Sequence, residues 1–193
     1  NGIKNNFNVN LKNLNSTGKN ISEYKSSPEV QLSSIFELNS ILPLKKQSLK
    51  YVNYLTPKAS LRWNPNDMED HTLSKRTINT DNIFSIDRLG LDDSFETGKS
   101  ITLGLDYKKE TIDDMNKYFN LKLATVFRDK KEAFIPRNTT LNKKSSNIFG
   151  SVSANLIDHI NLNYKFAADN NLNDLEYSDI NATLSVNNFV TSF

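Results

Sequence analysis

The last third of the chain, residues 147–193, alternates apolar and polar residues with a period of two. The alternation runs through residues 148–156 and resumes at 160–168 and 180–186. Successive side chains of a β-strand point to opposite faces, so each run predicts a strand with one apolar and one polar face. The runs are about nine residues long, whereas soluble strands most often have about 5–6 and membrane-spanning strands need about 9–11. Periodicity alone leaves two alternatives open, a membrane barrel and a soluble all-β protein with a wet sheet face.

The same period returns through the rest of the chain. Further strands are predicted at residues 6–14, 30–38, 59–63, 101–107 and 119–127. The short turns between them imply antiparallel pairing, and we expect about nine or ten strands in total. Pro43 marks a strand end or bulge, because proline cannot donate to a sheet ladder, and Pro57 interrupts residues 50–63.

Two long polar stretches, residues 64–82 and 129–144, are predicted to be loops. Loops of this length are uncommon inside compact soluble domains but are typical of the extracellular side of outer-membrane barrels. One irregularity remains near the C-terminus, where Leu175 and Tyr177 are out of phase with the run from Ile180. Either a β-bulge near residues 178–179 changes the phase, or Tyr177 points into the lumen of the barrel.

Composition narrows the class of protein. Hydrophobic residues make up 37% of the 193 residues, and no apolar run is long enough for a membrane helix. A barrel strand is apolar on one face only, so a weak hydropathy signal is expected of it. The net charge of +2 argues against nucleic acid as the main partner. The chain starts at Asn1 without an apolar leader, and we expect it to be a fragment of a longer protein.

The sequence offers no catalytic or metal-binding motif. Cysteine is absent, which excludes disulfides and thiolate chemistry. His71 and His159 lack the spacing of metal ligands. The acidic run from Asp169 has Asp174 and Ile180 where a calcium loop needs glycine and glutamate. Nucleotide-binding and hydrolase motifs are also missing. We therefore expect neither an enzyme nor a cofactor.

Three stretches together resemble one family. Residues 82–105 are similar to the signature "N-x-F-s-x-x-R … D-x-x-E-x-G … x-T-x-G-l" in the barrel of LptD, the lipopolysaccharide-assembly protein also called the organic solvent tolerance protein. Residues 55–59 resemble the start of an upstream strand in that family, and residues 135–150 resemble its passage "S-t-l … k-x-S-d-i-x-G". The residues that carry the signature, with an expected structural role, are Phe84, Arg88, Asp93, Glu96, Gly98, Gly104, Ser146 and Gly150.

The resemblance implies a fold and a function. The fold is a very large outer-membrane β-barrel joined to a periplasmic jellyroll. Residues 1–193 would form part of that single barrel domain, without the jellyroll and the closing strands. In isolation such a piece is expected to be all-β, an open curved antiparallel sheet with two unpaired edges. The implied function is insertion of lipopolysaccharide (LPS) into the outer leaflet of a Gram-negative outer membrane. The implied partners are LPS, outer-membrane lipids, an LptE-type lipoprotein plug and the periplasmic Lpt bridge.

A lumen lined by Asn, Ser, Thr and Lys suits the passage of a polar, phosphorylated glycan. Lys122, Arg128 and Lys165 are candidates for binding its phosphate groups if they face the lumen. The alternative is that these three are ordinary solvated lumen residues. Two other functions also remain open, an outer-membrane porin or receptor and a soluble β-sheet adhesin or structural module.

Overall fold

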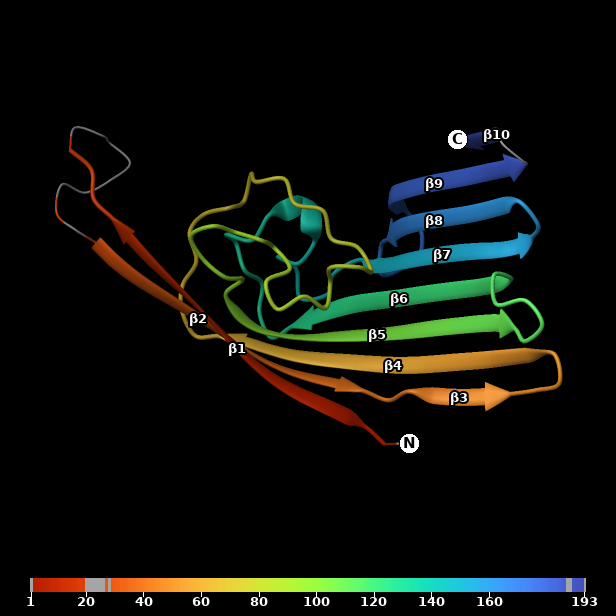
Figure 1. Ribbon diagram of the computed structural model, residues 1–193. Coiled ribbons are helices and arrows are strands. Elements are labelled where there is room, and N and C mark those ends of the chain that lie inside the picture. The colour runs from red at the N-terminus through yellow and green to blue at the C-terminus, as the bar shows by residue number, and fades with distance from the viewer. Residues whose placement is uncertain (1, 20–26, 28, 187–188, 193) are drawn as a thin grey trace.

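One antiparallel sheet carries almost all of the regular structure (Figure 1). The computed structural model describes residues 2–19, 27, 29–186 and 189–192. Its ten strands follow the order β1-β2-β4-β5-β6-β7-β8-β9-β10, and β3 also pairs with β4. The strands are β1 Lys4–Ser16, β2 Glu29–Ile41, β3 Leu44–Gln47, β4 Tyr51–Asn64, β5 Gly98–Thr111, β6 Tyr118–Arg128, β7 Ile148–Ile157, β8 Ile160–Ala168, β9 Leu175–Val186 and β10 Phe189–Ser192. A single turn of 3-10 helix, η1, spans Arg137–Thr139.

The sheet is curved and open, with β1 at one edge and β10 at the other (Figure 1). Each strand from β4 onward pairs with the next in the chain, both across the short turns and across the long loops 65–97 and 129–147. The predicted all-β, open antiparallel sheet is therefore confirmed, and its curvature is consistent with a partial barrel. Among the described residues, no helix is long and apolar enough to cross a membrane.

The two prolines near the start of the sheet, Pro43 and Pro57, lie on neighbouring segments. β2 ends at Ile41 and β3 begins at Leu44, so the predicted break at Pro43 is confirmed. β4 instead runs unbroken through Pro57. The Pro57 carbonyl accepts a hydrogen bond from the Leu42 amide at 3.0 Å. The missing amide hydrogen of Pro57 therefore faces the side where β2 gives way to β3, and no regular ladder bond is lost there.

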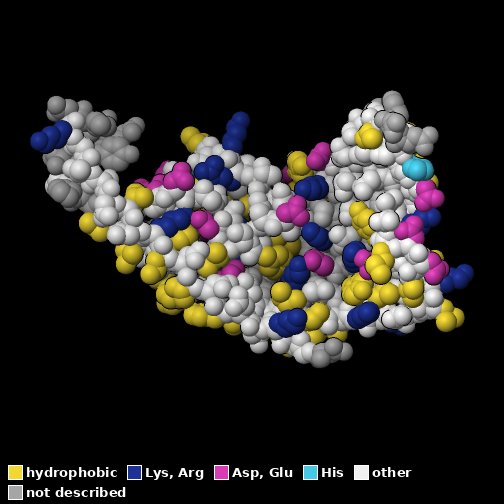
Figure 2. Space-filling view, in the orientation of Figure 1, with side chains coloured by type: hydrophobic (Ala, Val, Ile, Leu, Met, Phe, Trp, Pro, Cys, Tyr) yellow, Lys and Arg dark blue, Asp and Glu magenta, His cyan; other side chains and the backbone are white. Residues whose placement is uncertain are grey.

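The two faces of the sheet differ in polarity. In register across β1, β2, β4, β5 and β6, the side chains of Phe7, Leu38, Leu61, Ile101 and Phe127 form an apolar row. Most of this row is exposed on the outer, convex face. Figure 2 shows hydrophobic side chains along the lower rim of the view, whereas basic and acidic side chains mix in the hollow above. The alternation predicted from sequence thus separates an apolar convex face from a polar concave face.

Two long loops, residues 65–97 and 129–147, fold onto the concave side instead of extending into solvent (Figure 1). They enclose a hydrophobic cluster with β6, β7 and β8. The loops contribute Met68, Ile78, Ile83, Leu89, Leu91, Ile135 and Leu141, and the strands contribute Ala124, Val126, Phe149 and Ala167. The main core of the described structure therefore lies between the loops and the sheet.

The position of Tyr177 explains why the apolar–polar alternation changes phase within β9. Tyr177 pairs with Ala167, and the register shift falls between Ala167 and Ala168, opposite residues 175–177. Tyr177 also lines a hollow of about 250 Å³ together with the buried residues Phe149 and Ala167. Features of both alternatives are therefore present: Tyr177 faces the concave side, and a register shift lies beside it, a little before residues 178–179.

Candidate functional site

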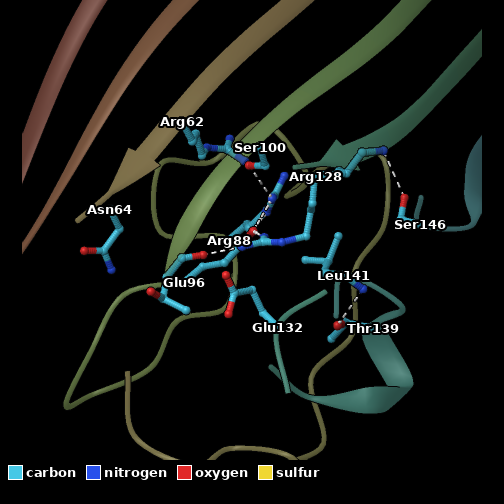
Figure 3. Close-up of polar contacts among 12 residues, drawn as sticks. Arg62, Asn64, Arg88, Glu96, Ser100, Arg128, Glu132, Thr139, Leu141 and Ser146 are labelled. Atoms are coloured by element: carbon cyan, nitrogen blue, oxygen red, sulfur yellow. Dashed lines mark hydrogen bonds and ion pairs between the residues drawn. The ribbon is translucent and has the colours of Figure 1, made fainter. Parts of the chain in front are cut away.

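A buried ion pair lies where the first long loop meets the sheet. Arg88 and Glu96, both in loop 65–97, form a two-pronged contact, with Nε–Oε2 at 2.6 Å and Nη2–Oε1 at 2.5 Å (Figure 3). Their side chains are only 1% and 6% exposed. Arg88 also donates to Thr102 Oγ1 at 2.8 Å and to Ser100 Oγ at 3.2 Å, both on β5. The pair therefore fastens the loop to the sheet.

Arg128, at the end of β6, joins the same pair. One guanidinium nitrogen donates to Glu96 Oε1 and another to the carbonyl of Thr97. Burial would raise the pKa of the Glu96 carboxyl, but Arg88 and Arg128 outweigh it and lower that pKa to about 2. Glu96 therefore remains ionised between two guanidinium groups throughout the physiological pH range.

The cluster continues to the other side of the loop. On β4, Arg62 Nε donates to Glu37 Oε1 of β2 at 2.8 Å, and Ser60 Oγ donates to the same oxygen at 2.9 Å. Arg62 also donates to the carbonyl of Ile83 at 3.2 Å. Three arginines and two glutamates therefore link β2, β4, β5 and β6 to loop 65–97. These groups are joined by charge-assisted hydrogen bonds.

Two glycines make room for this loop. A Cβ atom at Gly104 would lie 2.6 Å from Cζ of Phe84, so the ring of Phe84 rests against the bare backbone of β5. Gly98 has a φ of +83°, a backbone conformation that residues other than glycine adopt only at an energetic cost. A Cβ atom there would also lie 2.7 Å from Glu132 Oε1 in the second loop.

The chain that carries these loops matches a known protein family. A family model described as LptD, LPS transport system D, matches residues 6–193. The chain belongs to the LptD family. The resemblance drawn from the signature residues is thereby confirmed, and the match supports a role in LPS transport in general. No curated protein matches the chain.

The remaining LptD signature residues also lie at contacts within the fold. Asp93 contacts His71 within loop 65–97, with Oδ1–Nε2 at 2.9 Å. Ser146 Oγ accepts from the amide of Val126 at 2.9 Å and donates to the carbonyl of Asn147 at 2.8 Å, which ties the second loop to β6. Gly150 lies under the ring of Phe166, which would overlap any Cβ atom at that position.

The three predicted phosphate-binding residues fall into two groups. Arg128 belongs to the buried cluster, where Glu96 and Thr97 already occupy its guanidinium. Lys122 and Lys165 instead converge on Asp81 in loop 65–97, with Nζ–oxygen distances of 3.2 and 2.9 Å. All three ion-paired groups remain partly exposed. The hydrogen bond from Lys165 holds the pKa of the Asp81 carboxyl below its usual range.

Loop 65–97 spans the concave side from β1 to β8. Near β1, Lys12 Nζ lies 2.7 Å from Asp87 Oδ2 and 4.2 Å from the centre of the Phe95 ring. Near β8, Asp81 meets Lys165. The ion pairs of Lys12, Glu37, Arg62 and Asp81 were not predicted from the sequence. Their only signal is a charge on the polar face of a strand or in a polar loop, which does not reveal the partner.

Within the described residues, no group of three or more His, Asp or Glu is placed to hold a metal ion. The arrangement instead has the features of a scaffold, in which a charged loop is fixed to the inner side of a curved wall.

Proposed function

We propose that this chain forms part of the wall of an outer-membrane β-barrel through which an LptD protein inserts LPS into the outer leaflet. The observation that carries the proposal is the continuous apolar convex face opposite a polar concave face, in a chain of an LPS transport family. A barrel wall needs this division, because one face meets lipid and the other meets water.

The ends of the strands support a membrane-facing role for the convex side. Near the long-loop ends, Trp63 and Phe127 are partly exposed, and the Trp63 ring stacks on Phe36 at 5.6 Å between centroids. Near the opposite ends, the Tyr107 and Phe119 rings lie 6.3 Å apart. Two bands of aromatic residues with aliphatic side chains between them are typical of membrane barrels.

The concave side suits a polar cargo. It carries Asn, Ser, Thr and Lys side chains on β6 to β9, and loop 65–97 crosses it. We extend the proposal to the partners that the family implies, an LptE-type lipoprotein plug and the periplasmic Lpt bridge. In this proposal residues 1–193 belong to one barrel domain located in the outer membrane.

Two measurements on the complete gene product test the proposal. A folded barrel in detergent migrates faster on a gel when unheated than when heated, and a soluble species without this shift would indicate an adhesin or structural module instead. Depletion of the protein should then lower LPS at the cell surface. Unchanged surface LPS with a heat-modifiable band would indicate a porin or receptor.

A further inference from the structure

A polar row crosses the concave face at one level of the sheet. Asp106, Lys122, Ser151, Lys165 and Asp179 are register neighbours on five successive strands, β5 to β9. The carboxylate of Asp106 is paired with Lys58 of β4. The centre of the row is therefore a lysine, a serine and a second lysine on three adjacent strands.

The tip of loop 65–97 occupies this centre. Each oxygen of the Asp81 carboxylate meets one lysine, Oδ1 with Lys122 at 3.2 Å and Oδ2 with Lys165 at 2.9 Å. Next to it, Thr80 Oγ1 and Ser151 Oγ are hydrogen-bonded at 2.8 Å. Strands β6 and β8 are about 10 Å apart, because β7 lies between them. The two lysine side chains close that gap by converging on a single anionic group.

We propose that Lys122, Ser151 and Lys165 form a binding site for a phosphate monoester, and that Asp81 occupies it as an internal substitute until such a ligand displaces it. This inference rests on the proposed function, since it places a phosphate site for the cargo on the concave wall.

Charge and exposure both favour a phosphate over the carboxylate. Lys122 and Lys165 both contact the Asp81 carboxylate, Asp106 is paired with Lys58, and Asp179 is a further negative charge beside Lys165. A phosphate monoester brings about 1.5 to 2 negative charges and three acceptor oxygens, more of both than the Asp81 carboxylate that it would replace. A third oxygen gives Ser151 a direct acceptor in place of Thr80. The lysines are partly exposed, so a ligand can reach them and the existing ion pairs are weak enough to exchange.

The Asp81→Asn variant is the sharpest test, because it removes the competitor and leaves both lysines in place. Binding to the full-length protein in detergent is measured with phosphorylated LPS and with the same LPS after enzymatic dephosphorylation. The variant should bind phosphorylated LPS roughly three- to tenfold more tightly than the unmodified protein. A purely structural role of Asp81 predicts equal or weaker binding, and that result would overturn the inference.

The lysines supply the second test. The double variant Lys122→Gln/Lys165→Gln should lose the preference for phosphorylated LPS. The matched control Lys143→Gln removes an exposed lysine of the second loop and should keep that preference. Heat-modifiable migration shows whether each variant is folded. Equal binding of both forms of LPS by the folded Asp81→Asn variant would also contradict the site.

Inorganic phosphate separates two sources of the ligand. If inorganic phosphate competes with phosphorylated LPS for binding, the site recognises the phosphate group alone. A preference for phosphorylated LPS that phosphate does not displace supports recognition of the phosphate within its glycolipid headgroup. If depletion lowers surface LPS but the Asp81→Asn variant binds no more tightly, this inference fails and the proposed function stands.

Discussion

At the scale of single residues, Gly104 shows how closely loop 65–97 approaches the sheet. A Cβ atom there would lie 2.6 Å from the Phe84 ring and 3.1 Å from the Leu123 carbonyl oxygen. We expect Gly104→Ala to lower the free energy of unfolding by about 1–3 kcal/mol, because neither the ring nor the backbone can withdraw freely. Urea unfolding of the protein in detergent, followed by heat-modifiable migration, measures the loss.

The matched control is Gly2→Ala, since nothing lies within 4 Å of a Cβ atom at that position. If the clash is the cause, the double variant Gly104→Ala/Phe84→Ala should lose less stability than the sum of the losses of the two single variants. A Gly104→Ala protein as stable as the unmodified one would contradict this account.

The Glu96 carboxylate predicts a dependence of stability on acid. Its pKa is about 2 in the folded protein against 4.5 for the unperturbed group. A depressed pKa stabilises the fold fully above about 4.5, and this contribution is lost as the pH falls from about 4.5 through about 2. The unfolding midpoint should decline across that window, and the Glu96→Gln variant should show a shallower decline.

Glu96→Gln should also destabilise the protein at neutral pH by about 3–5 kcal/mol, because Arg88 and Arg128 lose their buried counter-charge. Asp67→Asn is the control, since Asp67 is exposed and its loss should stay within about 0.5 kcal/mol. A Glu96→Gln profile parallel to that of Asp67→Asn would show that the cluster does not carry the acid response.

At the scale of elements, buried apolar side chains fix loop 129–147 to the sheet, although the sequence of this loop has no regular hydrophobic period. Ile135 is 0% exposed, whereas its neighbour Phe134 is 49% exposed. We expect Ile135→Ala to cost about 2–5 kcal/mol locally, since it opens a cavity under the loop. The readout is limited proteolysis, in which this loop should be cut faster while the strands remain protected.

The control Phe134→Ala removes a larger side chain but an exposed one, and it should leave the cleavage rate nearly unchanged. Equal protection of the loop in both variants would mean that the cluster under it does not hold it in place.

These elements also show what the sequence can and cannot predict. The strands were predictable, because alternation with a period of two is a local signal that each strand repeats along its whole length. The folded-in loops were not, because buried residues such as Ile78 and Leu141 are single apolar residues between polar neighbours. The strand through Pro57 was also misread as interrupted, because its tolerance depends on the break in the neighbouring strand.

The residues of the candidate site also fall into those that the sequence could reveal and those that it could not. Arg88 and Glu96 could be found through the family signature, although the sequence did not show that they pair with each other. Arg62 and Glu37 lie on different strands and pair only because β2 and β4 are neighbours, which a polar face cannot reveal. Asp81 was missed because its partners Lys122 and Lys165 are fixed by the register of three strands.

At the scale of the whole molecule, the two faces of the sheet should respond in opposite ways to a new charge. Leu103 lies in the middle of β5 on the convex face and is 42% exposed. Ser153 lies on β7 on the concave face, between Asn120 and Asn163 in the register. An arginine on the lipid side of a barrel near the middle of the membrane costs about 2–4 kcal/mol, whereas an arginine on the water-filled side costs little.

Leu103→Arg is therefore expected to lower the amount of folded protein in the outer membrane, and Ser153→Arg is expected to leave it near the normal level. Fractionation of the membranes followed by heat-modifiable migration measures the folded amount for each variant. A soluble sheet would tolerate both changes, because each side chain is in part exposed to solvent. Equal accumulation of the two variants would therefore argue against a lipid-facing convex surface, and with it against a barrel wall.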